Sequence, residues 1–218
     1  MKPRVDYTLY LCTDRELMTT DSIEEAVELA IKGGATVVQL REKDCSGRDF
    51  LEIAHSVKEV TDAYEIPLII NDRIDIALAV DADGVHLGQK DIPAMTAREL
   101  LGQDKIIGVS AYNAELALQA QKDGADYIGV GDVFGTSTKA DTHHVSIEEL
   151  TKIRNAVKIP MVAIGGVNHG NVEKLQGTGV DGVAVISAVI GAKDITGAAE
   201  QMVGKLEGIK RQPPGRLS

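Results

Sequence analysis

The hydrophobic positions of this chain follow two alternating patterns along its length. Short runs of β-branched and other apolar residues predict strands, and the longer segments between them have helical periodicity. Ile23, Ala26, Val27, Ala30 and Ile31, for example, form the apolar stripe of a helix that packs on a sheet. Strands are predicted at residues 8–13, 36–41, 68–71, 84–87, 105–110, 127–130, 161–164 and 182–186, and the predicted helices include residues 22–32, 47–63 and 114–122.

Similar short junctions precede several of these strands. They read GGA at residues 33–35, ADG at 82–84, GAD at 124–126 and VDG at 180–182. Glycine in each junction predicts a left-handed end to the preceding helix. A βα unit repeated in this way predicts a parallel sheet, and eight units favour a single-domain α/β protein, a (β/α)8 TIM barrel. A doubly wound open sheet is the alternative, although the first strand lacks a following G-x-G-x-x-G turn.

The chain length and composition set the limits of this domain. We assign residues 1–207 to the barrel and expect residues 208–218, which have no apolar period, to be a disordered tail. The 218 residues are near the short end for such a barrel, which typically has ~250. Hydrophobic residues make up 44% of the chain but aromatic residues only 3%, with no tryptophan, so aliphatic side chains are expected to fill the core.

Charge and cysteine content restrict the partners. A net charge of −10 argues against a nucleic-acid partner, and it requires that an anionic substrate find a local positive pocket. No apolar run approaches the ~20 residues of a membrane span. Cys12 and Cys45 have neither metal-type nor disulfide spacing, which fits a reduced, cytoplasmic setting. The sequence is compatible with a homo-oligomer but does not set the number of subunits.

The end of the second strand carries cationic side chains. In a parallel barrel the active site lies at the carboxyl ends of the strands. Because side chains alternate, Gln39, Arg41 and Lys43 share one face, towards the barrel mouth, and Leu40 shares the other with Glu42. Two cations and an amide predict a diphosphate clamp. An internal ion pair between a cation and a barrel acid remains the alternative.

Two acids follow the third and fourth strands. Asp72 and Asp91 would lie just beyond neighbouring strand ends, ~4.8 Å apart, within reach of one ion. Magnesium prefers one or two carboxylates together with substrate phosphates, so these acids are candidate Mg²⁺ ligands. Capping of the helices that follow is a more common use of acids at such positions, and this alternative stays open.

The remaining strand ends contain hydroxyl groups and glycines. Ser110 ends the fifth strand, and Thr136, Ser137, Thr138 and Lys139 follow the sixth, where they form either a phosphate-binding loop or a solvated one. Gly166 follows the seventh strand, and Ile186 and Ser187 end the eighth, at the usual phosphate site of such barrels. His86, within the fourth strand, is interpreted as a packed histidine.

Several of these segments together resemble the thiamine-phosphate synthase (thiamine-phosphate pyrophosphorylase) family. The resemblance rests on QLREKD at residues 39–44, INDR at 70–73, ADGVHLGQ at 82–89, IGVS at 107–110, TSTK at 136–139, AIGG at 163–166 and IS at 186–187. The first three motifs are the most specific, and the matches extend in order from residue 9 to about residue 187.

The resemblance implies roles for the strand-end residues in binding two phosphorylated small molecules. Residues that would contact the pyrimidine diphosphate are Gln39, Leu40, Arg41, Glu42, Lys43, Asn71, Ser110 and Lys139, of which Arg41, Lys43, Ser110 and Lys139 would be catalytic. Asp72 and Asp91 would bind Mg²⁺. Residues that would hold the thiazole phosphate are Thr136, Ser137, Thr138, Gly166, Ile186 and Ser187.

The resemblance also implies a reaction, in which diphosphate leaves the pyrimidine methylene and the thiazole nitrogen attacks. Two departures bear on it: Asp132 and Gly135 stand where the family usually has prolines, so we expect a looser loop and an acid near bound anions. The rival interpretations are a thiazole tautomerase of the same fold, which would lose parts of the metal and diphosphate set, and a non-catalytic sensor of a phosphorylated ligand.

Overall fold

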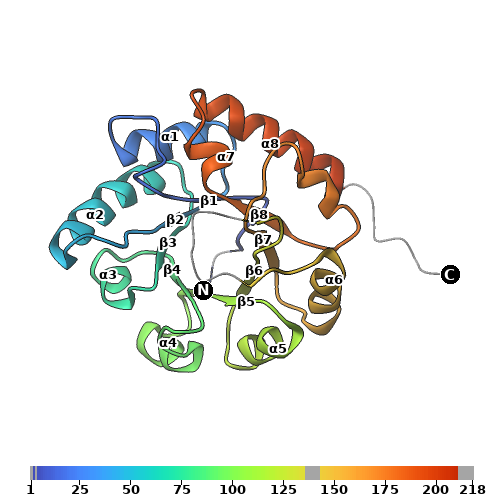
Figure 1. Ribbon diagram of the computed structural model, residues 1–218. Coiled ribbons are helices and arrows are strands. Elements are labelled where there is room, and N and C mark those ends of the chain that lie inside the picture. Colours follow the sequence, from blue (N-terminus) through green and yellow to red (C-terminus); the bar gives the residue numbers. More distant parts are fainter. Residues whose placement is uncertain (1, 3, 136–142, 211–218) are drawn as a thin grey trace.

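In the computed structural model of this chain, eight parallel strands close into a barrel in chain order. Helices surround the barrel on the outside (Figure 1). The structure describes residues 2, 4–135 and 143–210. The strands are β1 (Leu9–Cys12), β2 (Val37–Leu40), β3 (Leu68–Asn71), β4 (Gly84–Leu87), β5 (Ile106–Ala111), β6 (Tyr127–Val130), β7 (Met161–Ile164) and β8 (Gly182–Val185). The helices are α1 (Ile23–Lys32), α2 (Gly47–Ala63), α3 (Ile74–Ala79), α4 (Ala94–Leu101), α5 (Ala114–Lys122), α6 (Ile147–Ala156), η1 (Val172–Leu175), α7 (Ser187–Ile190) and α8 (Ile195–Lys210). The predicted (β/α)8 barrel is confirmed.

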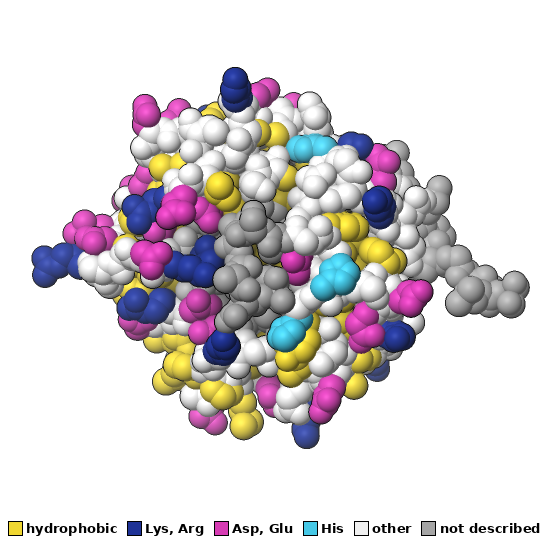
Figure 2. All heavy atoms as spheres, viewed as in Figure 1, with side chains coloured by type: hydrophobic (Ala, Val, Ile, Leu, Met, Phe, Trp, Pro, Cys, Tyr) yellow, Lys and Arg dark blue, Asp and Glu magenta, His cyan; other side chains and the backbone are white. Residues whose placement is uncertain are grey.

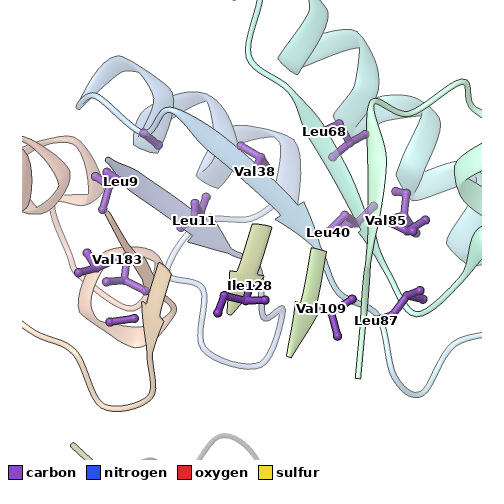
Figure 3. Packing of buried hydrophobic residues seen from close by; sticks show 14 of the residues in the cluster. Leu9, Leu11, Val38, Leu40, Leu68, Val85, Leu87, Val109, Ile128 and Val183 are labelled. Carbon is purple, nitrogen blue, oxygen red and sulfur yellow. The ribbon is translucent and has the colours of Figure 1, made fainter. Parts of the chain in front are cut away.

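Alternation along the strands separates the core into two layers. Outward-facing residues such as Leu9, Val38 and Leu40 pack beneath the helices (Figure 3). This outer layer is largely aliphatic, as predicted. The barrel interior is different, because Tyr7, Tyr10 and Tyr127 are buried there among smaller apolar residues. The expectation that aliphatic side chains fill the core therefore holds only in part for the interior, where three of the chain's seven aromatic side chains lie.

The predicted helices and strands match the observed ones closely, and the deviations lie at their ends. Helix α1 begins one residue after the predicted start, because Ser22 is its N-cap and accepts a hydrogen bond from the Glu25 amide. Helix α8 continues through Lys210, so residues 208–210 are helical and not part of a tail. The rest of the predicted tail, residues 211–218, lies outside the described residues.

The junction glycines have two different roles. Gly34 and Gly124 have positive φ values of 102° and 89°, as the predicted left-handed helix ends require. Gly84 and Gly182 instead begin β4 and β8, so the prediction is wrong for them. A Cβ at Gly84 would overlap the carbonyl oxygen of Ile106, which shows that glycine here allows two strands to approach closely.

The acids of the same junctions brace the amino ends of the strands. The carboxylates of Asp83 and Asp181 accept hydrogen bonds from the first backbone amides of β3 and β7, and that of Asp126 accepts one from the second amide of β5, at 2.8–2.9 Å. These acids lie at the rim opposite the carboxyl ends of the strands. The repeated Asp in the sequence therefore stabilises the barrel and leaves the other rim to the candidate site.

Candidate active site

Charged side chains gather at the carboxyl ends of β2 and β3. Figure 2 shows Lys and Arg side chains interspersed with Asp and Glu over this part of the face. Arg41 is half-buried, and its guanidinium lies 3.7 Å from the carboxylate of Asp14, which follows β1. Glu42 pairs with Arg15 at 2.6 Å. Lys43 is exposed. The alternative that Arg41 serves in an internal ion pair therefore applies in part, because Asp14 is its partner. At 3.7 Å, however, the two side chains are too far apart for a direct hydrogen bond.

The predicted alternation along β2 is confirmed. Leu40 is fully buried in the outer layer beneath the helices. Gln39 is 6% exposed inside the barrel, and its side-chain amide donates a hydrogen bond to the Tyr10 hydroxyl at 2.9 Å. The same register continues into the loop, where the Arg41 amide donates to the Thr13 hydroxyl at 3.1 Å. Gln39 therefore lies deeper in the barrel than a rim residue.

Asp72 and Asp91 lie at the same rim, on neighbouring strand ends. Asp72 directly follows β3 and has a φ of 63°, a region that non-glycine residues rarely occupy. Its backbone amide donates to the carbonyl oxygen of His86 on β4 at 2.9 Å. The Asp91 carboxylate accepts a 2.6 Å hydrogen bond from the Gly88 amide, which folds the loop after β4 back on itself. Asn71 is buried at the end of β3.

The helix-capping alternative for these acids is wrong. The N-cap of α3 is Arg73 and that of α4 is Pro93, and within the described part of the chain neither helix start has a side-chain cap. Among the described residues no group of three or more His, Cys, Asp or Glu side chains is arranged so that it could hold a metal ion by itself. Two carboxylates on adjacent strand ends nevertheless fit Mg²⁺, whose remaining ligands are commonly water and phosphate oxygens.

A chain of polar side chains crosses the barrel interior beneath this rim. From Gln39 it passes to Tyr10, whose hydroxyl lies 2.6 Å from that of Tyr127. The Tyr127 hydroxyl lies 2.9 Å from Nδ1 of His86, and Nε2 of His86 lies 2.9 Å from the Ser110 hydroxyl. Burial raises the pKa of both Tyr10 and Tyr127 well above the usual range, so both phenols stay protonated.

Sequence reasoning missed this chain. It named Gln39 and Ser110, the two ends, but interpreted His86 as a packed histidine and did not single out Tyr10 or Tyr127. A signal was available in the inward register of Tyr10 and Gln39, since neighbouring strands place inward residues side by side. Polar side chains at inward positions must satisfy each other, because water is excluded there.

Asp132 holds the start of the loop after β6 in place. Asp132 is 6% exposed, and its carboxylate accepts a hydrogen bond from the Gly135 amide at 2.9 Å. Its backbone bonds to His143 and Val145 at 2.8 and 2.7 Å. Within the described residues the Gly135 amide is held by Asp132. The expectation that Gly135 loosens the loop stays a prediction, because residues 136–142 lie outside the described residues.

The glycines after β7 fit against this loop. A Cβ at Gly165 would overlap the Asp132 carboxylate, and one at Gly166 would overlap the Gly135 carbonyl. Ile186 and Ser187 lie where β8 passes into α7. Gly166, Ile186 and Ser187 are thus on the same rim as Asp72. The predicted hydroxyl and lysine residues Thr136, Ser137, Thr138 and Lys139 lie outside the described residues.

These features define a (β/α)8-barrel with cations, two acids and a polar interior converging at the carboxyl ends of its strands, the arrangement of barrel enzymes that act on small anionic molecules. The model of the family described as thiamine monophosphate synthase matches residues 9–189. This chain therefore belongs to the thiamine monophosphate synthase family.

Individual relatives agree with this assignment. A thiamine-phosphate synthase of Ruminiclostridium cellulolyticum is 60% identical over 203 residues, covering 93% of this chain and 97% of the relative. One of Clostridium beijerinckii is 57% identical over 202 residues, with the same coverage. The solved thiamine phosphate pyrophosphorylase of Pyrococcus furiosus superposes with a TM-score of 0.87 at 45% identity, covering 94% of this chain and 97% of that one. Within the described part of this chain, no helix is long and apolar enough to cross a membrane.

Proposed function

We propose that this chain is a thiamine-phosphate synthase. It would condense 4-amino-2-methyl-5-(diphosphooxymethyl)pyrimidine with 4-methyl-5-(2-phosphooxyethyl)thiazole, giving thiamine phosphate and diphosphate. The observation that carries the proposal is the convergence of Arg41, Asp72, Asp91 and Ser110 on one rim, in a chain 57–60% identical to enzymes of that name. The substrates are phosphorylated metabolites, and neither Cys12 nor Cys45 forms a disulfide within the described residues, which supports a cytoplasmic location.

The reaction exchanges one bond for another without a net proton transfer to the protein. The bond between the pyrimidine methylene carbon and the diphosphate oxygen breaks, and its electron pair leaves with diphosphate. The amino group of the pyrimidine ring shares the positive charge that remains. The lone pair of the thiazole nitrogen then forms the new carbon–nitrogen bond, so the reaction needs no general base to create the nucleophile.

The protein would accelerate this step by stabilising charge on the departing diphosphate. Arg41 suits that task because a guanidinium has five N–H donors and its loose contact with Asp14 leaves donors for the substrate. Lys43 and Lys139 would add further positive charge. A chain with a net charge of −10 repels an anion at long range, so these local cations decide whether the diphosphate binds.

Asp72 and Asp91 would hold Mg²⁺ between the ends of β3 and β4. Bound magnesium would supply Lewis-acid stabilisation of the leaving diphosphate. The thiazole phosphate would lie against Gly166, Ile186 and Ser187, with Thr136 to Thr138 completing its phosphate site. Holding the thiazole nitrogen close to the reacting carbon lowers the entropic part of the barrier by several kcal/mol.

One assay tests the proposal against its rivals. The purified chain is incubated with both substrates and Mg²⁺, and thiamine phosphate and diphosphate are measured together. Equal amounts of the two products support the synthase. Conversion of a thiazole phosphate without the pyrimidine would indicate a tautomerase, and binding of either ligand without turnover would indicate a sensor.

A further inference from the structure

The interior polar chain has a direction that follows from counting protons. Each buried tyrosine keeps its single hydroxyl proton, because burial raises its pKa. The Tyr10 oxygen accepts from Gln39, which leaves the Tyr127 oxygen, its other hydrogen-bond partner, as the acceptor that can satisfy the Tyr10 proton. With its oxygen accepting from Tyr10, Tyr127 has its own proton to donate to Nδ1 of His86, which lies 2.9 Å away. A ring nitrogen that accepts carries no proton, so this direction of the hydrogen bonds places the His86 proton on Nε2.

This direction determines what Ser110 can do. The N–H at Nε2 of His86 donates to the Ser110 hydroxyl oxygen at 2.9 Å. The serine oxygen is thereby an acceptor towards the interior, and its proton must point to another acceptor. Ser110 is half-exposed near the carboxyl end of β5, next to the rim where the substrates would bind. The Ser110 hydroxyl can therefore donate a hydrogen bond to a molecule bound at the mouth of the barrel.

The backbone next to these hydrogen-bonded side chains leaves space for the rings of Tyr127 and His86. A Cβ at Gly108 of β5 would overlap the phenol ring of Tyr127. A Cβ at Gly129 of β6 would lie 3.0 Å from Cε1 of His86, tighter than ordinary van der Waals contact. Two strands therefore have glycine where the tyrosine and histidine rings lie. This second observation is independent of the hydrogen bonds and indicates a built arrangement.

We propose that His86 is a positioning residue for Ser110. Held in its Nε2-protonated form by Tyr127, it fixes the Ser110 hydroxyl as a donor to an acceptor atom of the pyrimidine diphosphate. The identity of that substrate rests on the proposed function, but the direction of the hydrogen bonds does not. His86 itself need not touch the substrate to act in this way.

Kinetics of paired variants test the positioning role. His86→Leu removes the donor to Ser110, and kcat/KM for the pyrimidine diphosphate should fall roughly tenfold, as expected for one lost hydrogen bond. His86→Gln retains an N–H donor and should recover most of the loss. In a Ser110→Ala background, His86→Leu should cause little further loss, because the interaction it removes is already gone.

A matched control separates this role from a general effect of losing a histidine. His169 is also half-buried, and within the described residues its Nε2 donates to the carbonyl oxygen of Ala198 on helix α8 at 2.9 Å, not to the interior side chains. His169→Leu should leave kcat/KM within about twofold of the parent. Losses from His86→Leu and Ser110→Ala that simply multiply in the double variant would overturn the proposal.

A spectroscopic measurement decides the tautomer without any substrate. In protein containing ¹⁵N-labelled histidine, with the His86→Gln variant used to assign the signals, His86 should show a proton on Nε2 and none on Nδ1. Tyr127→Phe should release this preference and mix the two tautomers. A proton on Nδ1 in the parent protein would mean that the interior hydrogen bonds run in the opposite direction, and it would overturn the inference.

The two tests keep the failure of this inference separate from that of the proposed function. If the parent protein forms no thiamine phosphate, the proposed function fails, and the ¹⁵N spectrum still decides the state of His86. If the parent turns over and His86→Leu is as active, the positioning role is overturned and the synthase stands.

Discussion

The backbone amide of Asp72 donates to the carbonyl oxygen of His86 at 2.9 Å, which ties the end of β3 to β4. Asp72 makes this contact with a φ of 63°, a backbone conformation that is higher in free energy for a non-glycine residue. The contact links the two parts of the site: the carboxylate of Asp72 lies at the rim, while the ring of His86 lies in the interior chain. Strained backbone conformations of non-glycine residues, such as that of Asp72, cluster at functional sites.

Asparagine at either acid should abolish most of the activity without disturbing the backbone. Asn tolerates positive φ as well as Asp does, so Asp72→Asn removes charge while the fold is kept. We expect Asp72→Asn and Asp91→Asn each to lower turnover by about 10²-fold or more and to raise the Mg²⁺ concentration needed for half-maximal rate. Initial rates over a magnesium titration measure both effects.

Asp75 provides the control for this experiment. It is exposed in the first turn of α3, where it pairs with Arg73 at 2.6 Å, and its pKa is lowered mainly by that hydrogen bond. Asp75→Asn should leave the magnesium titration unchanged. Full activity of Asp72→Asn and Asp91→Asn in chelator-treated buffer would rule out the metal role.

Replacement of Arg41 should weaken the binding of the diphosphate more than that of the thiazole. Arg41→Gln removes a fixed positive charge and paired donors, so KM for the pyrimidine diphosphate should rise at least about tenfold. Arg4, exposed before β1 at the opposite rim, is a matched control, and Arg4→Gln should have no such effect. An equal rise in KM for both substrates would contradict a specific diphosphate contact.

The sequence was sufficient for the barrel and the rim because both depend on strand register. Alternation along residues 39–43 predicted that Leu40 faces the helices and that Gln39 faces inward, and both hold. The positions of Asp72 and Asp91 followed from parallel strands ending at one edge.

What the sequence did not reveal depends on contacts between segments far apart in the chain. Tyr10 and Tyr127 are 117 residues apart, and only the closed barrel brings their hydroxyls together. The same applies to Gly84. Glycine is needed there because the backbone of the adjacent strand β5 lies close to it, and not because it ends the preceding helix. A local pattern carries no information about such partners.

Two glycine-to-alanine substitutions should change stability in opposite directions. Gly108→Ala would drive a methyl group into the Tyr127 ring and should lower the free energy of unfolding by about 1–3 kcal/mol or more. At Gly204, inside α8, a Cβ would meet no described atom within 4 Å, and Gly204→Ala should raise the free energy of unfolding by about 0.5–1 kcal/mol. Urea unfolding measures both, and a neutral Gly108→Ala would mean that the ring can move aside.

Asp132 and Gly135, where the resemblance implies prolines, give two predictions for the loop after β6. Asp132→Ala leaves the Gly135 amide without its acceptor, whereas Asp132→Asn keeps a side-chain oxygen there. If the hydrogen bond orders the loop, Asp132→Ala should raise KM for the thiazole phosphate several-fold and Asp132→Asn should not. Equal effects of the two variants would show that charge, not the hydrogen bond, is what matters at this position.

Restoring proline at position 135 should harm the loop as it is built in this chain. Gly135 has a φ of 81°, which proline cannot adopt, and its N–H is the donor to Asp132. Gly135→Pro should therefore weaken thiazole-phosphate binding at least as much as Asp132→Ala. The double variant Asp132→Ala/Gly135→Pro should lose little more than Gly135→Pro alone, because the proline has already removed the amide that Asp132 accepts from. Calorimetric titration of the thiazole phosphate into each variant measures these differences directly.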